Sequence, residues 1–140
     1  MKKSFLTIAL FILIGITSNL LSQEPQVKTS YLSFKEMTNN FGNIKEVNGA
    51  VTGTFEFTNI AKTPITINSV KATCGCTTPD WTKEPIAPGK NGYIKATYNP
   101  TNRPGKFSKS ITVSTSTGET IILKIEGNVE PKPVETPISQ

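Results

Sequence analysis

The 140-residue sequence contains no histidine, and Asp80 is its only aspartate. A serine or cysteine nucleophile needs a neighbouring base whose pKa lies near the working pH, and histidine is the commonest such base. A pair of glutamates can hydrolyse a glycosidic bond, but most of the candidates occupy positions typical of solvated surface charges: Glu36, Glu46, Glu56, Glu84, Glu119 and Glu126. We therefore expect no enzyme, no catalytic residues and no cofactor.

Long hydrophobic runs are also missing, apart from one near the N-terminus. Lys2 and Lys3 precede an apolar run over residues 5–16, which polar and small residues follow. This is the build of a secretory signal peptide, and the run is shorter than the roughly 20 residues that a membrane-spanning helix needs. We predict a signal peptide at residues 1–22, a mature chain from about Gln23 without a membrane anchor, and a location in the periplasm or outside the cell.

Neither sign of charge is in strong excess on the rest of the chain. The formal net charge is +5, of which Lys2 and Lys3 supply two, so residues 23–140 carry a net charge of +3. The remaining lysines are scattered singly and often stand beside an acid, as Lys35 stands beside Glu36. Such a pattern is typical of a solvated surface and not of a phosphate-binding stripe. We expect no nucleic-acid partner.

Period-two alternation of apolar and polar residues dominates residues 30–130, which predicts β-strands. In the clearest stretch, Val51 to Asn59, the residues Val51, Gly53, Phe55 and Phe57 share one face. Similar stretches predict further strands at residues 31–35, 65–73, 93–98, 107–113 and 120–127. Clusters of Gly, Pro and Asn separate these stretches. The sequence predicts an all-β chain with one immunoglobulin-like antiparallel β-sandwich of about seven strands.

The segments that flank the predicted sandwich have a different composition. Residues 23–29 are mostly polar, and residues 131–140 contain Pro131, Pro133 and Pro137 with few apolar groups. Such composition cannot bury enough apolar surface to hold a fixed structure. We predict a flexible N-terminal segment and a disordered, proline-rich tail.

The two cysteines, Cys74 and Cys76, flank Gly75 and would meet an oxidising environment after export. Residues two apart in an extended strand have Cβ atoms about 6 to 7 Å apart, whereas a disulfide needs about 3.5 to 4.5 Å. A bend at Gly75 would allow a small, easily reduced ring. Without a bend, both thiols would face one side of the sheet and pack as small apolar groups. The three residues are therefore candidates for a structural, disulfide or redox role.

Metal binding is the remaining interpretation of this cysteine pair. Two thiolates can hold a soft ion such as Cu(I), but the usual histidine ligands are missing and Met37 is the only methionine after the predicted signal peptide. Zinc would lack ligands. We assign no metal-binding residue.

Trp81 is the only tryptophan, and prolines stand near it on both sides. An exposed indole can stack on a sugar or a peptide, which makes Trp81 a candidate binding surface. In a small β-sandwich a single tryptophan also commonly covers the core or a loop. Both interpretations stay open at the level of sequence.

Several short motifs resemble, in order along the chain, domain-of-unknown-function family 1573: Phe41-Gly42-Asn43-Ile44, Phe55-Glu56-Phe57-Thr58-Asn59, Cys74-Gly75-Cys76-Thr77, Pro85-Ile86-Ala87-Pro88-Gly89 and Gly127-Asn128-Val129. The Cys-Gly-Cys-Thr run is the most specific of them. The resemblance implies an exported bacterial protein, mainly of Bacteroidetes, with an immunoglobulin-like module of the ASPM, SPD-2 and Hydin type. It implies no activity, because the family has none established.

Two functions remain as hypotheses. The first is an exported, non-catalytic binding or scaffold module of the cell envelope, which would bind an envelope protein or complex through a strand edge or through loops. The alternative is a thiol-redox or copper-handling protein that uses Cys74 and Cys76.

Overall fold

The computed structural model describes residues 30–133. The predicted signal peptide at 1–22, the segment 23–29 and residues 134–140 of the predicted tail lie outside the described residues. Within the described range, no helix is long and apolar enough to cross a membrane.

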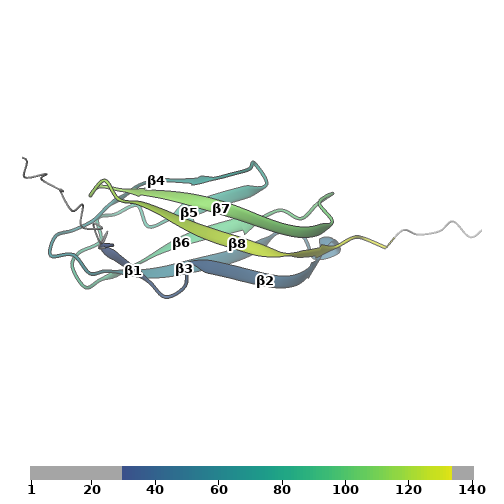
Figure 1. Cartoon of the computed structure of the whole chain (residues 1–140), viewed down its shortest axis with the longest axis horizontal. Helices are drawn as coiled ribbons and strands as arrows, with labels where there is room; N and C mark the ends of the chain where they lie inside the picture. Colours follow the sequence, from purple (N-terminus) through teal and green to yellow (C-terminus); the bar gives the residue numbers. More distant parts are fainter. Residues whose placement is uncertain (1–29, 134–140) are drawn as a thin grey trace, which may run out of the picture.

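Eight strands form a sandwich of two four-stranded sheets (Figure 1). One sheet has the order β1-β3-β6-β5 and the other the order β2-β8-β7-β4. The all-β sandwich is as predicted, with one strand more than the expected seven. In chain order the elements are β1 (Leu32–Phe34), β2 (Thr38–Lys45), the 3-10 helix η1 (Glu46–Asn48), β3 (Val51–Asn59), β4 (Ile67–Ala72), β5 (Thr77–Trp81), β6 (Asn91–Tyr98), β7 (Gly105–Thr115) and β8 (Thr120–Glu130).

The chain changes sheets between its first two strands. β1 pairs antiparallel with β3, and after a short connection β2 pairs with β8 in the other sheet. The β2–β8 pair is parallel, whereas all other strand pairs among the described residues are antiparallel. The predicted antiparallel sandwich is confirmed, and this one parallel pair lies at the edge of its second sheet. As a consequence, residue 30 and residue 133 lie at opposite ends of the sandwich (Figure 1).

The core lies between the two sheets and follows the alternation in the sequence. On β3, Gly53, Phe55 and Phe57 are buried while Thr54 and Glu56 are exposed, as predicted. The facing strands contribute branched and aromatic side chains, which fit a pleated, half-buried surface. Their fully or nearly fully buried members include Ile94, Tyr98, Ile111, Val113, Leu123 and Ile125.

An aromatic pair ties the two sheets together near the start of β7. Tyr98 on β6 stacks on Phe107 on β7, with ring centroids 3.9 Å apart and planes 11° from parallel. Stacked rings add to the area that the pair buries. Burial raises the pKa of the Tyr98 phenol, and the positive charge of Arg103 partly opposes this rise.

Two strands were not predicted because their residues do not alternate clearly between apolar and polar. β2 reads TNNFGNIK, with polar residues on both faces and a bulge in its pairing between Asn40 and Asn43. β5 has five residues and contains Pro79, which lacks the backbone donor that a central strand needs. Both are edge strands, where these features are tolerated.

Glu46 in η1 binds backbone groups at the end of the sandwich where the described chain ends. The backbone N–H of Asn102 donates to Glu46 Oε1 at 2.8 Å, and that of Lys132 donates to Oε2 at 3.2 Å. These two hydrogen bonds, the one from Asn102 first, lower the pKa of the Glu46 carboxyl below its ordinary value of 4.5. The carboxylate thus connects η1, the β6–β7 loop and the C-terminal end of the described chain.

We expect Glu46 to stabilise the fold near neutral pH but not in acid. Because the pKa of Glu46 is lower in the folded state, the unfolded state takes up its proton first as the pH falls through 4.5. The stabilisation is present above 4.5 and is lost as the pH falls further, through the folded-state pKa. Thermal unfolding of Glu46→Gln should therefore occur below that of the unchanged protein near pH 7, with the gap closing in acid. Glu36→Gln, at an exposed position, is the control. A gap of constant size across this range would contradict the prediction.

Candidate functional site

The cysteine pair lies in the turn where the chain crosses from β4 in one sheet to β5 in the other. Cys74 and Cys76 form a disulfide, with Cα atoms 5.2 Å apart. A bend brings the two sulfurs together, because Thr77 N donates to Cys74 O at 3.3 Å and closes the turn. Cys76 is buried, whereas Cys74 is only partly buried.

Gly75 is at the tip of this turn, although its special conformational freedom is not used there. Its φ is not among the positive values of the described glycines. A Cβ at Gly75 would meet no atom within 4 Å. The bend therefore arises from the backbone hydrogen bond and the crossover itself, and it does not require glycine.

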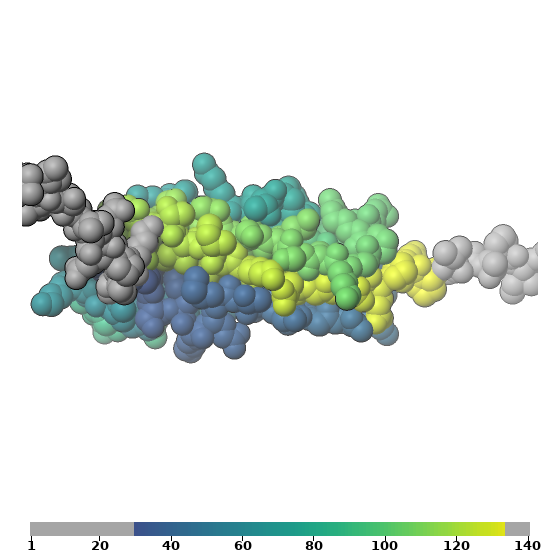
Figure 2. Space-filling view, viewed as in Figure 1, coloured from purple at the N-terminus to yellow at the C-terminus, as the bar shows by residue number. Residues whose placement is uncertain are grey.

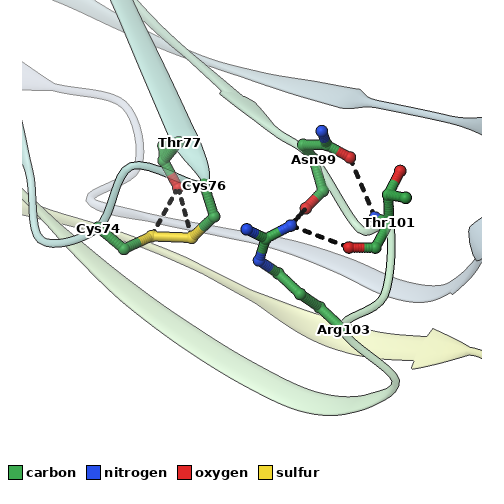
Figure 3. The surroundings of a disulfide bond; sticks show 6 residues. All are labelled: Cys74, Cys76, Thr77, Asn99, Thr101 and Arg103. Carbon is green, nitrogen blue, oxygen red and sulfur yellow. Dashed lines mark hydrogen bonds between the residues drawn. A yellow bond between two sulfur atoms is a disulfide. The ribbon is translucent and has the colours of Figure 1, made fainter.

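Cys76 belongs to the apolar core and Cys74 packs against it, while Thr77, Asn99 and Arg103 supply polar groups near the disulfide (Figure 3). The Thr77 hydroxyl lies 3.7 Å from Cys74 Sγ and 3.9 Å from Cys76 Sγ, and it is the donor because disulfide sulfurs carry no hydrogen. Asn99 N donates to Cys76 O at 2.9 Å. Arg103 Nη1 donates to Thr101 O at 2.9 Å and to Asn99 O at 3.4 Å, which holds the guanidinium beside the disulfide turn.

The disulfide contributes little to the stability of the fold. A crosslink stabilises a protein mainly by restricting the unfolded chain, and the effect decreases with the size of the closed loop. The loop here closes at a sequence separation of 2. On the chain-entropy estimate such a loop contributes about 1.5 kcal/mol, roughly half of what a 15-residue loop would give.

Trp81 lies at the far end of β5 and is partly buried against the core. Its Nε1 donates to Ile67 O on β4 at 3.3 Å, so the indole bridges the two edge strands on this side of the sandwich. Lys83 Nζ lies over the ring, 2.8 Å from its centroid. The indole thus has partners along its edge and over one face, an arrangement that fits the covering interpretation better than an open stacking platform.

A groove of about 560 Å³ lies on the surface of β2, β8 and β7. In the register, Asn40, Glu126 and Ser108 form one row of opposed residues across the three strands, and Asn43, Asn128 and Lys106 form the next. Figure 2 shows this side of the molecule, with β8 in yellow between β2 in blue and β7 in green. The groove is lined by both rows together with Gly42, Phe107 and Gly127.

Amide side chains link neighbouring strands within these rows. Asn40 Nδ2 donates to Glu126 Oε1 at 3.2 Å, and Asn128 Nδ2 donates to Asn43 Oδ1 at 3.2 Å. Each amide has two donor hydrogens and two acceptor lone pairs, so these bonds leave hydrogen-bonding capacity on every member. Lys124 Nζ pairs with Glu126 Oε2 at 2.7 Å beside the groove.

The bulge in β2 creates the room between the two rows. Gly42 adopts a φ of 64°, a left-handed conformation that favours glycine, and its N–H donates to Asn40 Oδ1 at 2.8 Å. Gly127 lies between the rows on β8, and a Cβ there would come within 2.9 Å of the Phe107 ring and 3.0 Å of Gly42 O. Bulges commonly re-aim side chains at functional sites.

Sequence reasoning did not identify this groove. Its β2 and β8 residues come from the motifs Phe41-Gly42-Asn43-Ile44 and Gly127-Asn128-Val129, which are far apart in the chain. Their shared richness in Asn and Gly was the available signal, but only the parallel β2–β8 pairing places them together. The described residues contain no group of three or more His, Cys, Asp or Glu side chains that could hold a metal ion.

A family model described as a protein of unknown function, DUF1573, matches residues 32–129. The chain belongs to this family. The match runs from β1 into β8 and so covers the disulfide turn, Trp81 and the groove of the DUF1573 domain. Among curated proteins, no significant match is found.

Solved structures support the fold of this DUF1573 domain. A PapD-like domain of human CEP192 aligns with a TM-score of 0.63 at 9% identity, over 79% of this chain and 94% of that one. A protein of unknown function from Porphyromonas gingivalis aligns with a TM-score of 0.57 at 14% identity, over 69% of this chain and 44% of that one. The Vibrio cholerae protease VesB aligns with a TM-score of 0.55 at 16% identity, over 71% of this chain and 32% of that one.

These similarities concern the fold alone. The DUF1573 chain spans less than half of the P. gingivalis protein and about a third of VesB. At these identities they place the domain among immunoglobulin-like and PapD-like sandwiches, a fold that hosts many functions.

Proposed function

We propose that this DUF1573 protein is an exported, non-catalytic binding module of the cell envelope, and that the groove along β2, β8 and β7 is its binding face. The observation that carries the proposal is the two rows of polar side chains on either side of Gly127, which the bulge in β2 separates. The partner is an extended, polar segment of another envelope protein or complex.

The spacing of the rows favours an extended peptide. Glu126 and Asn128 are two positions apart on β8, so their side chains emerge on the same face. An extended peptide lying along β8 presents its own groups on one side at the same two-residue interval. Amides that both donate and accept hydrogen bonds suit the N–H and C=O groups of such a backbone.

Carbohydrate is the less favoured ligand at this groove, because sugar binding commonly relies on an exposed aromatic face. The aromatic residue that lines the groove, Phe107, stacks its ring on Tyr98 between the sheets. Trp81 lies on β5 in the other sheet, under the Lys83 ammonium.

Carboxylates with structural partners support the non-catalytic part of the proposal. Glu56 pairs with Lys35, Glu126 pairs with Lys124, and Glu46 accepts two backbone N–H groups. A general acid or base needs a carboxylate that is free to exchange protons with a substrate. The missing histidine removes the commonest alternative base.

A photo-crosslinking amino acid at two positions tests the binding face. Ser108 lines the groove, whereas Thr54 is exposed on β3 in the opposite sheet. Crosslinking in intact envelopes should give a defined protein adduct from position 108 and not from position 54. The same adduct from both positions, or none from position 108, would argue against the groove.

Introducing a large charged side chain into the groove allows the loss of binding affinity to be measured. Ser108→Arg should weaken binding of the crosslinked partner by at least about tenfold, which corresponds to about 1.4 kcal/mol. Thr54→Arg should leave the affinity unchanged. Both variants should melt close to the unchanged protein, so that lost binding is not lost folding.

A further inference from the structure

The disulfide of the crossover turn has an arrangement that structural crosslinks do not need. Cys74 is only partly buried and packs against the core, whereas Cys76 is buried within it, so Cys74 is the more open of the two. An incoming thiolate therefore reaches Cys74 Sγ, and Cys76 is the sulfur that leaves. Which sulfur is attacked, and how well the other leaves, govern the rate of thiol–disulfide exchange.

Cys76 is buried in the apolar core, so its thiolate depends on the polar groups that lie beside it. The Thr77 hydroxyl is within hydrogen-bonding reach of both sulfurs, so it can donate to a thiolate at either position. Arg103 is held close by Asn99, which is itself bonded to the Cys76 carbonyl. A hydrogen-bond donor and a nearby cation stabilise a thiolate, and a stabilised thiolate is a better leaving group.

The turn is also fixed without the sulfur–sulfur bond. The Thr77 N–H closes it onto Cys74 O, and the Asn99 N–H binds Cys76 O. Since the ring is small, the bond adds little by restricting the unfolded chain. The oxidised and the reduced pair can therefore occupy the same turn, as repeated oxidation and reduction require.

We propose that Cys74 and Cys76 form a thiol–disulfide exchange site that accepts two electrons from a dithiol of another exported protein. A partner thiolate attacks Cys74 Sγ, the Cys74–Cys76 bond breaks, and the electron pair leaves on Cys76 Sγ, which Thr77 stabilises. The second partner thiolate then attacks the partner sulfur of the mixed disulfide and releases Cys74. The partner ends as a disulfide, and Cys74 and Cys76 end as a dithiol after taking up two protons. The site is separate from the groove, so the two proposals stand or fall independently.

The rate of exchange with dithiothreitol tests the proposal, with the short oxidised peptide of residues 73–77 as the matched control. The peptide has the same ring without the fold around it. We expect the protein disulfide to react about tenfold faster than that of the peptide. Acid quenching, alkylation and mass spectrometry at successive times measure both rates. An equal or slower rate in the protein would overturn the proposal.

Two variants separate a redox role from a structural one. Thr77→Val keeps the shape of the side chain, and Arg103→Gln removes the charge. Each should slow exchange roughly three- to tenfold and move thiol alkylation of the reduced protein to higher pH. Unchanged rates and alkylation profiles in both variants would mean that these groups play no part in exchange.

The thermal stability of the reduced protein completes the test. On this proposal the reduced protein and the variant Cys74→Ser/Cys76→Ser keep the fold and melt roughly 5–10 °C below the oxidised protein, as a contribution of about 1.5 kcal/mol predicts. Loss of the fold on reduction would assign the disulfide a structural role instead. In the variant Cys76→Ser, the Cys74 thiolate should attack oxidised glutathione and form a stable mixed disulfide, and failure to form it would show that a partner sulfur cannot reach Cys74 Sγ, contrary to the proposal.

Discussion

Truncation of Phe57 to alanine is expected to lower the free energy of unfolding by about 4 kcal/mol. The Phe57 side chain is 1% exposed, and its ring packs against Phe34 with centroids 5.1 Å apart. The loss combines the transfer free energy of the ring with the cavity left behind, which neighbouring strands fill only partly. Urea denaturation of the unchanged and altered proteins measures the difference.

A second substitution opposite Phe57 sharpens this prediction. Gly92 pairs with Phe57 across β3 and β6, and a Cβ there would lie 2.5 Å from the Phe57 ring and 3.0 Å from Ile86 Cδ1. Gly92→Ala alone should therefore destabilise the fold by about 1–3 kcal/mol through overpacking. In the Phe57→Ala background the same methyl group enters the cavity and should be neutral or stabilising. Simple addition of the two losses would contradict this description of the packing.

Gly75→Ala is the matched control for Gly92→Ala. The methyl group added at Gly75 meets no atom within 4 Å, and the residue does not adopt a positive φ. We expect a change within about 0.5 kcal/mol in either direction.

Replacing Asn59 with alanine is expected to cost about 3 kcal/mol. Asn59 is fully buried at the end of β3, where its Nδ2 donates to Thr63 O at 2.9 Å and to Ile86 O at 2.8 Å. Its Oδ1 accepts from Ala61 N at 2.8 Å. The substitution removes all three bonds and leaves backbone groups without their partner, which costs more than the bonds themselves stabilise.

The effect of Asn59→Ala is measured by denaturation against Asn68→Ala, at an exposed position on β4. The control should change the free energy of unfolding by no more than about 0.5 kcal/mol. If Asn59→Ala were equally mild, the side chain would not connect β3 to the loops that contain Thr63 and Ile86 in the way that its hydrogen bonds indicate.

Much of the fold could be predicted because burial imposes a period of two on the central strands. β3 was predicted with its observed bounds, and its buried face with it. The edge strands β2 and β5 escaped prediction because an edge can tolerate Asn, Gly and Pro that a central strand cannot. The parallel pairing of β2 with β8 also has no signal in the local sequence, because it depends on the chain changing sheets after β1.

The candidate sites were predictable to different degrees. The cysteine spacing indicated that a disulfide needs a bend, and the structure places a disulfide in a turn. Which residues surround it could not be predicted, because Arg103 comes from a loop that follows a different strand. The groove depends on three segments, one from the first half of the chain and two from the second, and none carries a pattern that predicts binding by itself.

Because the two ends of the described chain lie at opposite ends of the sandwich, a pulling force applied to both would act along the strands (Figure 1). β2 and β8 are parallel neighbours joined over six register pairs, and β2 lies towards the N-terminus while β8 leads to the C-terminus. Tension between the two exits pulls these strands in opposite directions along their own axes. The hydrogen bonds between them are then loaded in shear and share the force, whereas exits at one end would let them open one after another.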